Sequence, residues 1–380
     1  MRMRLRGLAH IFMANAWLCS AVGLCILGAA GSPADAAEIN AALGHGGSAT
    51  QSTTNGGFTA ALAVDGNFGN FTHTLSGDPN PTWQIDLGTS IRLDSLSIFN
   101  RGGGCCQSRL RDITVEVLDW AGNSVYVSPL LNPENILGGG GTGGPPQLDL
   151  PGLGVLGRTI RVIRTPDPDL SGTGGVGNAD EGSVLSLGEV VARADNLALN
   201  RPVSESSNIG FAAANGNNDA LGDFTHTSNA DPSPFWQVDL EGAYYIDSVV
   251  IHNRDNCCGG RLRDITVDIL AADGSTVVYS SPLLNPDNAL GGGDPNNYAS
   301  GPETLAVDLH ALVGNAVGGN FVRVRRTPSQ FTTGNVDDAI VLSMGEVQVF
   351  GAAVPEPSTL ALAAMAGVGL LAAARRRRTV

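Results

Sequence analysis

Two loops of this sequence combine a pair of adjacent cysteines with flanking arginines. The second loop, at 253–264, reads NRDNCCGGRLRD, and an earlier version at 100–112 reads NRGGGCCQSRLRD. An arginine side chain only donates hydrogen bonds, from a rigid planar fork. Two converging arginines can therefore be satisfied by neighbouring hydroxyl oxygens of a neutral ligand, without any acceptor on the protein. A neutral sugar offers such hydroxyl groups together with an apolar ring face.

The pairing of the cysteines sets how rigid these loops are. Outside the N-terminal segment the only cysteines are Cys105, Cys106, Cys257 and Cys258. Two adjacent cysteines joined to each other have Cα atoms at most ~3.8 Å apart, below the usual disulfide range, so the bond is strained and stiffens the loop. Four cysteines allow three pairings, of which one is vicinal in both loops and two join the loops to each other. We expect vicinal disulfides whose sulfur surface packs against a sugar ring, with thiols as the alternative.

The N-terminal segment predicts export. Residues 1–10 carry three arginines, residues 11–30 form an apolar run, and Ala34-Asp35-Ala36 supplies small residues for cleavage. This order is typical of a secretory signal peptide over 1–36, with a membrane anchor as the alternative. Export would place the mature chain in an oxidising compartment, where disulfides form.

The C-terminal segment, 353–380, has three parts in a fixed order. A Pro-Glu-Pro sequence at 355–357 is followed by an apolar stretch at 360–374 and by four arginines at 375–378. The apolar stretch is shorter than the roughly 20 residues that span a bilayer, which favours a short helix that anchors the chain to the membrane transiently. The three parts resemble the PEP-CTERM sorting signal of Gram-negative bacteria. That resemblance implies removal of the tail by an exosortase and delivery to the cell surface or the extracellular matrix.

The charge balance of the remaining chain excludes several partners. Of the 36 acidic and 22 basic residues, two acids and seven arginines lie in the two end segments, so the body carries 34 acids, 15 arginines and a net charge near −19. Nucleic acid and anionic lipid headgroups are poor partners for such a surface. Solubility and divalent cations are favoured instead.

An internal repeat divides the body into two domains. Phe-Thr-His-Thr occurs at 71–74 and 224–227, and Trp-Gln-(Ile/Val)-Asp-Leu occurs at 83–87 and 236–240. The offset is 152 or 153 residues through most of the repeat and rises to 157 near its end. A period of this length indicates tandem domains and not a solenoid of short units. The predicted domains are residues 37–193 and residues 194–352.

Apolar residues alternate with polar ones in short segments bounded by turn residues. In the second copy we predict strands at 236–240, 246–252, 265–270, 321–325 and 341–350. Period-two alternation with frequent turns predicts an all-β fold built as an antiparallel sandwich in each copy. A jelly roll is the version we expect.

The second copy resembles a known family of lectins. Asn-Leu-Ala-Leu-Asn-Arg-Pro at 196–202 is followed by a His-Thr, a Trp-Gln-Val-Asp-Leu strand and Asn-Arg-x-x-Cys-Cys-x-x-Arg-Leu. This order resembles the F-type lectins, or fucolectins, of the galactose-binding-like group that includes the factor 5/8 C-type (discoidin) domains. The likeness covers nearly all of each copy. It implies a β-jelly roll that binds L-fucose, often with a calcium ion nearby.

The family's sugar motif is a His, then Arg-x-Asp, then a basic residue. In the second copy His226 precedes Arg254 by 28 residues and Arg261 follows Arg254 by seven, while the motif's Asp is replaced by Asn256 and an acid, Asp255, stands one place early. The acid would help to hold a guanidinium group. The sugar contacts that the resemblance implies in this copy are His226, Arg254, Asp255, Cys257, Cys258 and Arg261.

The first copy departs further from the motif. His73 also precedes Arg101 by 28 residues, but the interval from Arg101 to Arg109 is eight, and no acid follows Arg101. We therefore expect this copy to be altered in specificity or silent. The corresponding residues are His73, Arg101, Cys105, Cys106 and Arg109.

Calcium is a second expectation that the resemblance brings. The family's ligands lie on a loop before the His and at a Glu in the last strand, and an all-oxygen set suits this cation. An Asx turn capped by glycine is the alternative for the loop. The implied ligands are Leu62, Asp65, Asn67, Asn70 and Glu189 in the first copy, and Asn215, Asn217, Asp223 and Glu346 in the second.

These observations lead to one preferred function. We predict an exported, lectin-like carbohydrate-binding protein of the cell surface or extracellular matrix of a Gram-negative bacterium, with a fucosylated glycan or an extracellular polysaccharide as partner. The alternative is a structural adhesin in which the sugar sites are degenerate. An enzyme is not expected, because the sequence shows neither a Ser-His-Asp set nor a His-Glu-x-x-His motif.

Overall fold

The structure is a computed structural model that describes residues 37–45, 48–102, 105–139, 143–166, 182–255, 257–291, 300–328 and 340–355. The predicted signal peptide, the apolar stretch of the sorting signal and Asn256 lie outside these residues. The described residues contain no helix of the length and apolar character needed to cross a membrane.

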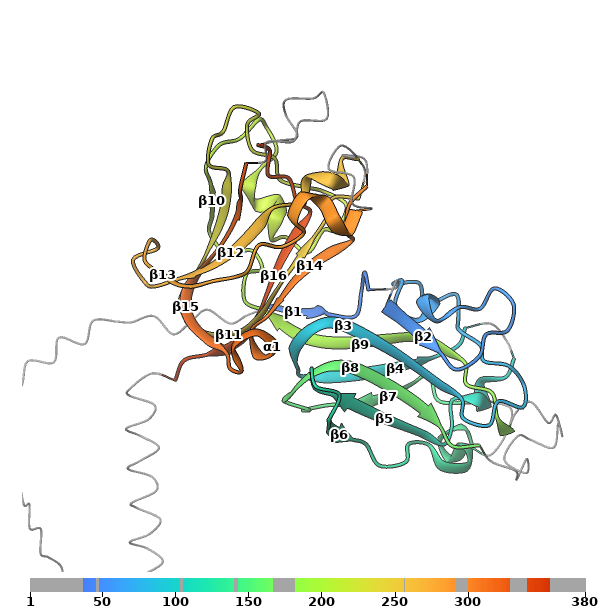
Figure 1. Ribbon diagram of the computed structural model, residues 1–380. Helices are drawn as coiled ribbons and strands as arrows, with labels where there is room; N and C mark the ends of the chain where they lie inside the picture. The colour runs from blue at the N-terminus through green and yellow to red at the C-terminus, as the bar shows by residue number, and fades with distance from the viewer. Residues whose placement is uncertain are drawn as a thin grey trace, which may run out of the picture. The chain divides into compact units, whose positions relative to one another are not determined.

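The first copy forms two antiparallel sheets (Figure 1). One sheet has the order β1-β9-β4-β7 and the other the order β2-β3-β8-β5-β6. The strands are β1 (Ala37–Asn40), β2 (Ala49–Gln51), β3 (Thr82–Leu93), β4 (Ser95–Asn100), β5 (Ile113–Leu118), β6 (Ser124–Val127), β7 (Gln147–Leu150), β8 (Val155–Arg164) and β9 (Leu187–Asn196).

The second copy repeats this arrangement with one long strand shared between its two parts. β11 pairs first with β10 and β15 and then, beyond register shifts, with β14 and β16, while β12 and β13 extend the first part. The elements are β10 (Val203–Glu205), β11 (Phe235–His252), β12 (Ile265–Leu270), β13 (Val277–Ser280), β14 (Thr304–Asp308), α1 (Leu309–Val313), β15 (Val317–Arg326) and β16 (Glu346–Ala353).

The predicted all-β class is therefore right: the described chain is mostly strand, in several antiparallel sheets. Two details of the predicted strands are wrong. The segments 236–240 and 246–252 belong to one strand, β11, although its register with β15 shifts between Asp239 and Tyr244, where Glu241 has a left-handed backbone with φ 55°. The last strand begins at Glu346 and not at Val341, although Val341 is buried.

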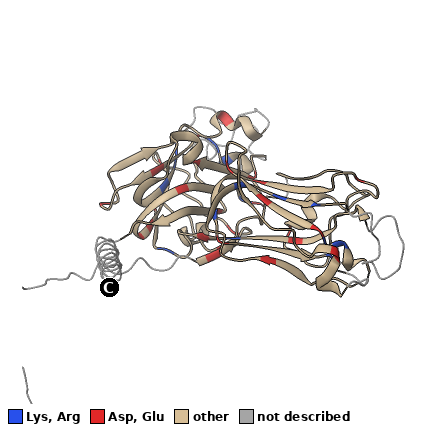
Figure 2. Cartoon of the chain, turned by 90° about the horizontal axis from the view of Figure 1, so that it is seen from below, with Lys and Arg blue, Asp and Glu red and all other residues tan. Residues whose placement is uncertain are grey.

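Alternation places the core side chains between the sheets. In the first copy Trp83 and Ile85 of β3 are fully buried against residues of β4, β8 and β9. Among the residues that the structure describes, acidic and basic positions are spread over the strands and loops (Figure 2). This distribution agrees with the acidic balance of the sequence.

A buried tryptophan in each copy links the core to the loop before the histidine. Trp83 Nε1 donates to the carbonyl oxygen of Ala60 at 2.9 Å, and Trp236 Nε1 donates to that of Ala213 at 2.8 Å. Both acceptors lie in short 3-10 turns, η2 (Ala60–Ala63) and η7 (Ala213–Gly216). The core thereby fixes the start of the loops that carry the candidate site.

Replacing Trp236 by Phe should lower the free energy of unfolding by about 2 kcal/mol, since the change removes a buried hydrogen bond and leaves a cavity. The measurement is urea denaturation of the mature chain. Trp120→Phe is the matched control, because Trp120 is 49% exposed, and it should change the free energy by less than about 0.5 kcal/mol. Equal effects of the two changes would contradict this role for Trp236.

Candidate functional site

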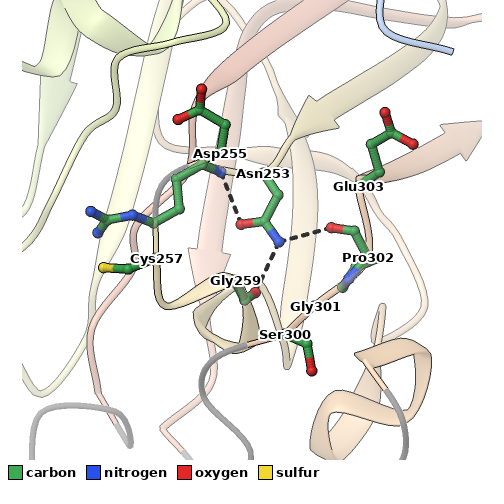
Figure 3. A pocket seen from close by; sticks show the side chains of 9 residues that line it. Asn253, Asp255, Cys257, Gly259, Ser300, Gly301, Pro302 and Glu303 are labelled. Atoms are coloured by element: carbon green, nitrogen blue, oxygen red, sulfur yellow. Dashed lines mark hydrogen bonds between the residues drawn. The ribbon is translucent and has the colours of Figure 1, made fainter. Parts of the chain in front are cut away.

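One asparagine side chain fastens the cysteine loop of the second copy. Asn253 Nδ2 donates to the carbonyl oxygens of Gly259 at 2.9 Å and Pro302 at 2.8 Å (Figure 3). Its Oδ1 accepts a hydrogen bond from the backbone N–H of Arg254 at 2.9 Å. These three bonds hold both sides of the loop to one side chain. Asn253 opens the motif, but its bracing role is not visible in the sequence.

The first copy is fastened in the same way. Asn100 Nδ2 donates to the carbonyl oxygens of Gln107 and Pro145, both at 2.8 Å. The second cysteine of each loop, Cys106 or Cys258, has a left-handed backbone with φ near 65° and starts a 3-10 turn. The turn directs the following arginine, Arg109 or Arg261, toward the interior, since this arginine is buried in both copies.

The histidine and that arginine are in direct contact. In the second copy His226 Nδ1 lies 2.7 Å from the carbonyl oxygen of Thr227, so this nitrogen carries the proton and donates. Nε2 is then an acceptor, and Arg261 Nη1 donates to it at 3.0 Å. A neutral imidazole therefore positions the guanidinium group. The sequence analysis predicted that His226 contacts the sugar. In the structure both of its ring nitrogens contact protein groups.

The same contact is present in the first copy. His73 Nε2 lies 2.8 Å from Arg109 Nη1, and His73 Nδ1 lies 2.5 Å from the carbonyl oxygen of Thr74. The longer interval from Arg101 to Arg109 does not prevent this pairing.

The first arginine of the motif stacks on a phenylalanine. The guanidinium carbon of Arg254 lies 3.6 Å from the centroid of the Phe224 ring, and Arg254 Nη1 donates to Ser343 Oγ at 3.0 Å. Burial lowers the pKa of Arg254 to about 10, the charge of Arg261 adds to this effect, and the charge of Asp255 opposes it. The two arginines are thus close enough to repel, which favours a ligand that offers acceptor oxygens to both.

Aromatic rings form one side of each site. Phe211 packs on Phe224 with ring centroids 4.4 Å apart and lies 5.9 Å from His226. In the first copy Phe58 stacks on Phe71 at 4.6 Å, and Arg101 covers Phe71. The sequence analysis missed these rings, although the repeated Phe-Thr-His-Thr contains one of each pair.

The outer ring of each pair is accessible to a ligand. Phe58 is 39% exposed and Phe211 is 37% exposed. An exposed ring beside two arginines offers an apolar surface next to hydrogen-bond donors. This combination suits the two kinds of surface on a sugar.

The two cysteine pairs differ. Cys257 and Cys258 are joined by a disulfide bond. Cys105 and Cys106 lie side by side without a bond between their sulfur atoms. The glycine-lengthened first loop holds the same left-handed turn without the bond.

Asp255 is exposed, and in Figure 3 its carboxylate points away from Cys257. A hollow of about 260 Å³ is lined by Arg254, Asp255, Cys257 and the segment 300–303, whereas neither His226 nor Arg261 lines it. The structure therefore places Asp255 beside Arg254 at this hollow, while Arg261 and His226 contact each other outside its lining.

Hydrogen bonds hold three of the predicted cation ligands of the first copy, Asp65, Asn70 and Glu189. Asp65 Oδ2 accepts a hydrogen bond from Asn70 Nδ2 at 2.6 Å, and Glu189 Oε1 accepts one from the backbone N–H of Gly66 at 3.1 Å. Glu189 Oε2 and Asn70 Oδ1 are buried without a hydrogen-bond partner. Burial raises the pKa of Glu189 to about 7. The hydrogen bond from Gly66 opposes this rise, and the negative charge of Asp65 adds to it.

Two of the predicted cation ligands of the second copy use their side-chain amides elsewhere. Asn217 Nδ2 donates to the carbonyl oxygens of Ala198 and Arg201, and Asn215 Nδ2 donates to that of Phe224. These two side chains hold the backbone of the loop.

The next residue along the loop, Asn218, takes the place of Asp65. Asn218 Nδ2 donates to Asp223 Oδ2 at 3.0 Å, and Glu346 Oε2 accepts from the backbone N–H of Asn218 at 3.1 Å. Acid and amide have exchanged positions between the copies, and the second loop carries a further acid, Asp219, whose charge also acts on Glu346. Glu346 Oε1 and Asp223 Oδ1 are buried without a hydrogen-bond partner.

Burial raises the pKa of Glu346 to about 8. Across the described residues, no three His, Cys, Asp or Glu side chains gather closely enough to hold a metal ion. A cation at either place would therefore also need amide and carbonyl oxygens. The unsatisfied oxygens around Glu189 and Glu346 fit such a cation in chemical type.

Several solved structures resemble this chain. An F-lectin (fucolectin) from Morone saxatilis serum aligns with a TM-score of 0.33 and 21% identity, covering 84% of this chain and 100% of that one. The lectin domain of Lectinolysin complexed with Lewis B antigen aligns with a TM-score of 0.32 and 28% identity, covering 40% of this chain and 95% of that one.

Sequence comparison identifies the segments that carry the site. Residues 62–130 and 212–288 match the model described as a NedA-like, galactose-binding domain, and residues 353–378 match the PEP-CTERM protein-sorting motif. Fucolectin-1 of Anguilla japonica is 48% identical over 56 residues, 14% of this chain and 30% of that protein. Fucolectin of Anguilla anguilla is 42% identical over 77 residues, 19% of this chain and 46% of that protein. The chain thus spans less than half the length of these relatives. It carries two F5/8 type C segments of the NedA-like, galactose-binding kind, homologous to fucolectins, and ends with a PEP-CTERM sorting motif.

Proposed function

We propose that this protein is an exported, lectin-like protein that binds a neutral sugar of the L-fucose class through the second copy. The observation that carries the proposal is the cluster of Arg254, Arg261 and His226 beside the aromatic pair of Phe211 and Phe224. The names of the relatives, fucolectins, support the same ligand class. We infer that each copy folds as a jelly-roll sandwich with its loops gathered around this cluster.

Binding would use guanidinium N–H groups of both arginines. Arg261 donates to His226 and Arg254 donates to Ser343, which holds both guanidinium groups in place. Each guanidinium group has five N–H donors. Adjacent hydroxyl oxygens of a sugar could then bridge the two arginines, while Phe211 covers an apolar face of the ring. The lone pairs of such hydroxyl oxygens would be attracted to the positive potential between the two arginines.

Two sites on one chain would raise avidity for a surface with many sugars. The first copy supports this, because His73, Arg109, Arg101 and Phe71 repeat the contacts of the second. The sorting motif implies secretion and a place at the cell surface through the exosortase system. We propose a glycan of the surface or of the surrounding matrix as the partner.

We further propose that calcium stabilises the loop before the histidine. In the first copy Asp65, Asn70 and Glu189 would hold it, and in the second Asn218, Asp223 and Glu346 would do so. The unsatisfied buried oxygens of these side chains support the assignment. The cation would compensate buried negative charge and fix the loop against the last strand.

Arg261→Ala should weaken L-fucose binding at the second copy at least tenfold, because it removes one of the two converging donors and leaves His226 Nε2 without its donor. Isothermal titration calorimetry of the mature chain measures this loss. Arg193→Ala is the matched control, since Arg193 is an exposed arginine paired with Glu38. If attachment to cells or matrix persists without change in Arg261→Ala and Arg254→Ala, the adhesin alternative is correct instead.

Glu346→Gln should raise the melting temperature of the calcium-free protein at pH 8. The folded-state pKa of Glu346, about 8, lies above its ordinary value of 4.5. The folded state therefore holds the proton longer than the unfolded state, and the stability contributed by Glu346 falls as the pH rises from 4.5 to 8. The amide removes this loss. Differential scanning calorimetry at pH 5 and pH 8 checks the prediction.

Calcium should raise the melting temperature of the wild-type chain more than that of Glu346→Gln. The variant retains the first-copy set, so a smaller shift is expected there. Glu303→Gln is the control, because Glu303 is not among the proposed ligands. Equal calcium shifts in all three proteins would refute the second-copy site.

A further inference from the structure

A second hollow of the second copy lies outside the cysteine loop. It has a volume of about 330 Å³ and is lined by segment 232–235, which leads into β11, and by residues 323 and 325–328 at the end of β15. The described residues that line it include three arginines and no acid. In a chain with a net charge of −14 this is a locally basic surface.

Strand alternation places the hollow on the outer face of the sheet. Trp236, Val322 and Val324 are fully buried in the core, whereas Phe235 and Arg323 are half-buried. In the pairing register Arg325 stands opposite Phe235, and Arg323 stands opposite Gln237. The face outside the core therefore presents one aromatic ring beside two arginines.

Only one of these two arginines has an acidic partner among the described residues. Arg325 Nε donates to Asp268 Oδ2 at 2.6 Å. Arg323 instead donates to Gln237 Oε1 at 2.7 Å and to the carbonyl oxygen of Gly274 at 3.1 Å, both neutral. The guanidinium carbon of Arg323 lies 5.1 Å from the centroid of the Phe235 ring. The positive charge of Arg323 is thus left for a ligand.

The first copy shows the same sheet position without this feature. Arg161, the counterpart of Arg323, donates to Glu116 Oε2 at 2.9 Å. The positions of Phe235 and Arg325 are occupied there by Thr82 and Ile163, which pair with each other in the same register. In the second copy the added Arg325 forms the ion pair with Asp268, the acid of β12, so Arg323 has no ion pair with it.

We propose that this hollow is a separate binding site for a sugar that bears a carboxylate, such as a hexuronic acid unit of an acidic polysaccharide. The planar guanidinium group of Arg323 matches a carboxylate in bidentate geometry. The Phe235 ring offers a surface for the apolar face of the sugar. The volume is at the lower end of small-molecule sites, which span roughly 300–1,000 Å³. The ligand class differs from that of the arginine–histidine cluster.

Titration calorimetry of the mature chain with tetragalacturonate tests this site, with the neutral galactotetraose as the paired probe. The acidic probe should bind, and Arg323→Gln should weaken its binding at least tenfold. Arg325→Ile should weaken it as strongly, although Arg323 remains, because Asp268 stands opposite Arg323 in the register and is then available to pair with it. Circular dichroism verifies that both variants fold.

Two control variants separate this site from the others. Arg161→Gln changes the neutralised counterpart in the first copy and should leave acidic-sugar binding unchanged. Arg261→Ala should also leave it unchanged, even if binding of neutral sugar is lost. No binding of tetragalacturonate to the wild-type chain would overturn the proposal. The proposal would also be overturned if Arg323→Gln and Arg161→Gln weakened tetragalacturonate binding equally. The same holds if Arg261→Ala weakened this binding, or if Arg325→Ile retained it.

Discussion

The candidate site depends on holding two positive charges next to each other within a buried setting. Burial makes Arg254 costly to charge and lowers its pKa, and the positive charge of Arg261 adds to this effect. Groups without net charge contact the two arginines: the imidazole of His226, the hydroxyl group of Ser343 and the ring of Phe224. These contacts hold the two guanidinium groups in place.

The duplicated chain provides its own comparison for each part of this arrangement. The asparagine brace, the buried tryptophan and the histidine–arginine contact occur in both copies with nearly equal distances. These contacts are the framework of the loop. The cysteine pair, the outer face of β15 and the order of acid and amide differ between the copies. Differences in ligand are therefore expected from these three places and not from the framework.

Much of the fold followed from the sequence, because period-two alternation and a domain-sized repeat are strong signals. The merging of two predicted strands into β11 could not be foreseen, since a bulge leaves alternation almost unchanged on either side. For the site, spacing was enough to bring Arg254, Arg261 and His226 together. Spacing could not show that Nδ1 of His226 is committed to a backbone carbonyl oxygen, because tautomers depend on local geometry. Phe211 was missed because it is distant from the motif in sequence and carries no polar group. Asn218 was missed because the register of a loop without strand pairing is weakly specified.

The exchange of acid and amide between the loops before the two histidines limits how the repeats can recombine. Asp65 pairs with Asn70 in one copy, and Asn218 pairs with Asp223 in the other. A crossover between these two positions would join two acids in one product and two amides in the other. The first product would carry an added charge beside the glutamate, and the second would lose the carboxylate of the pair. Recombination inside this segment is therefore disfavoured, even though the surrounding repeats are similar enough to recombine.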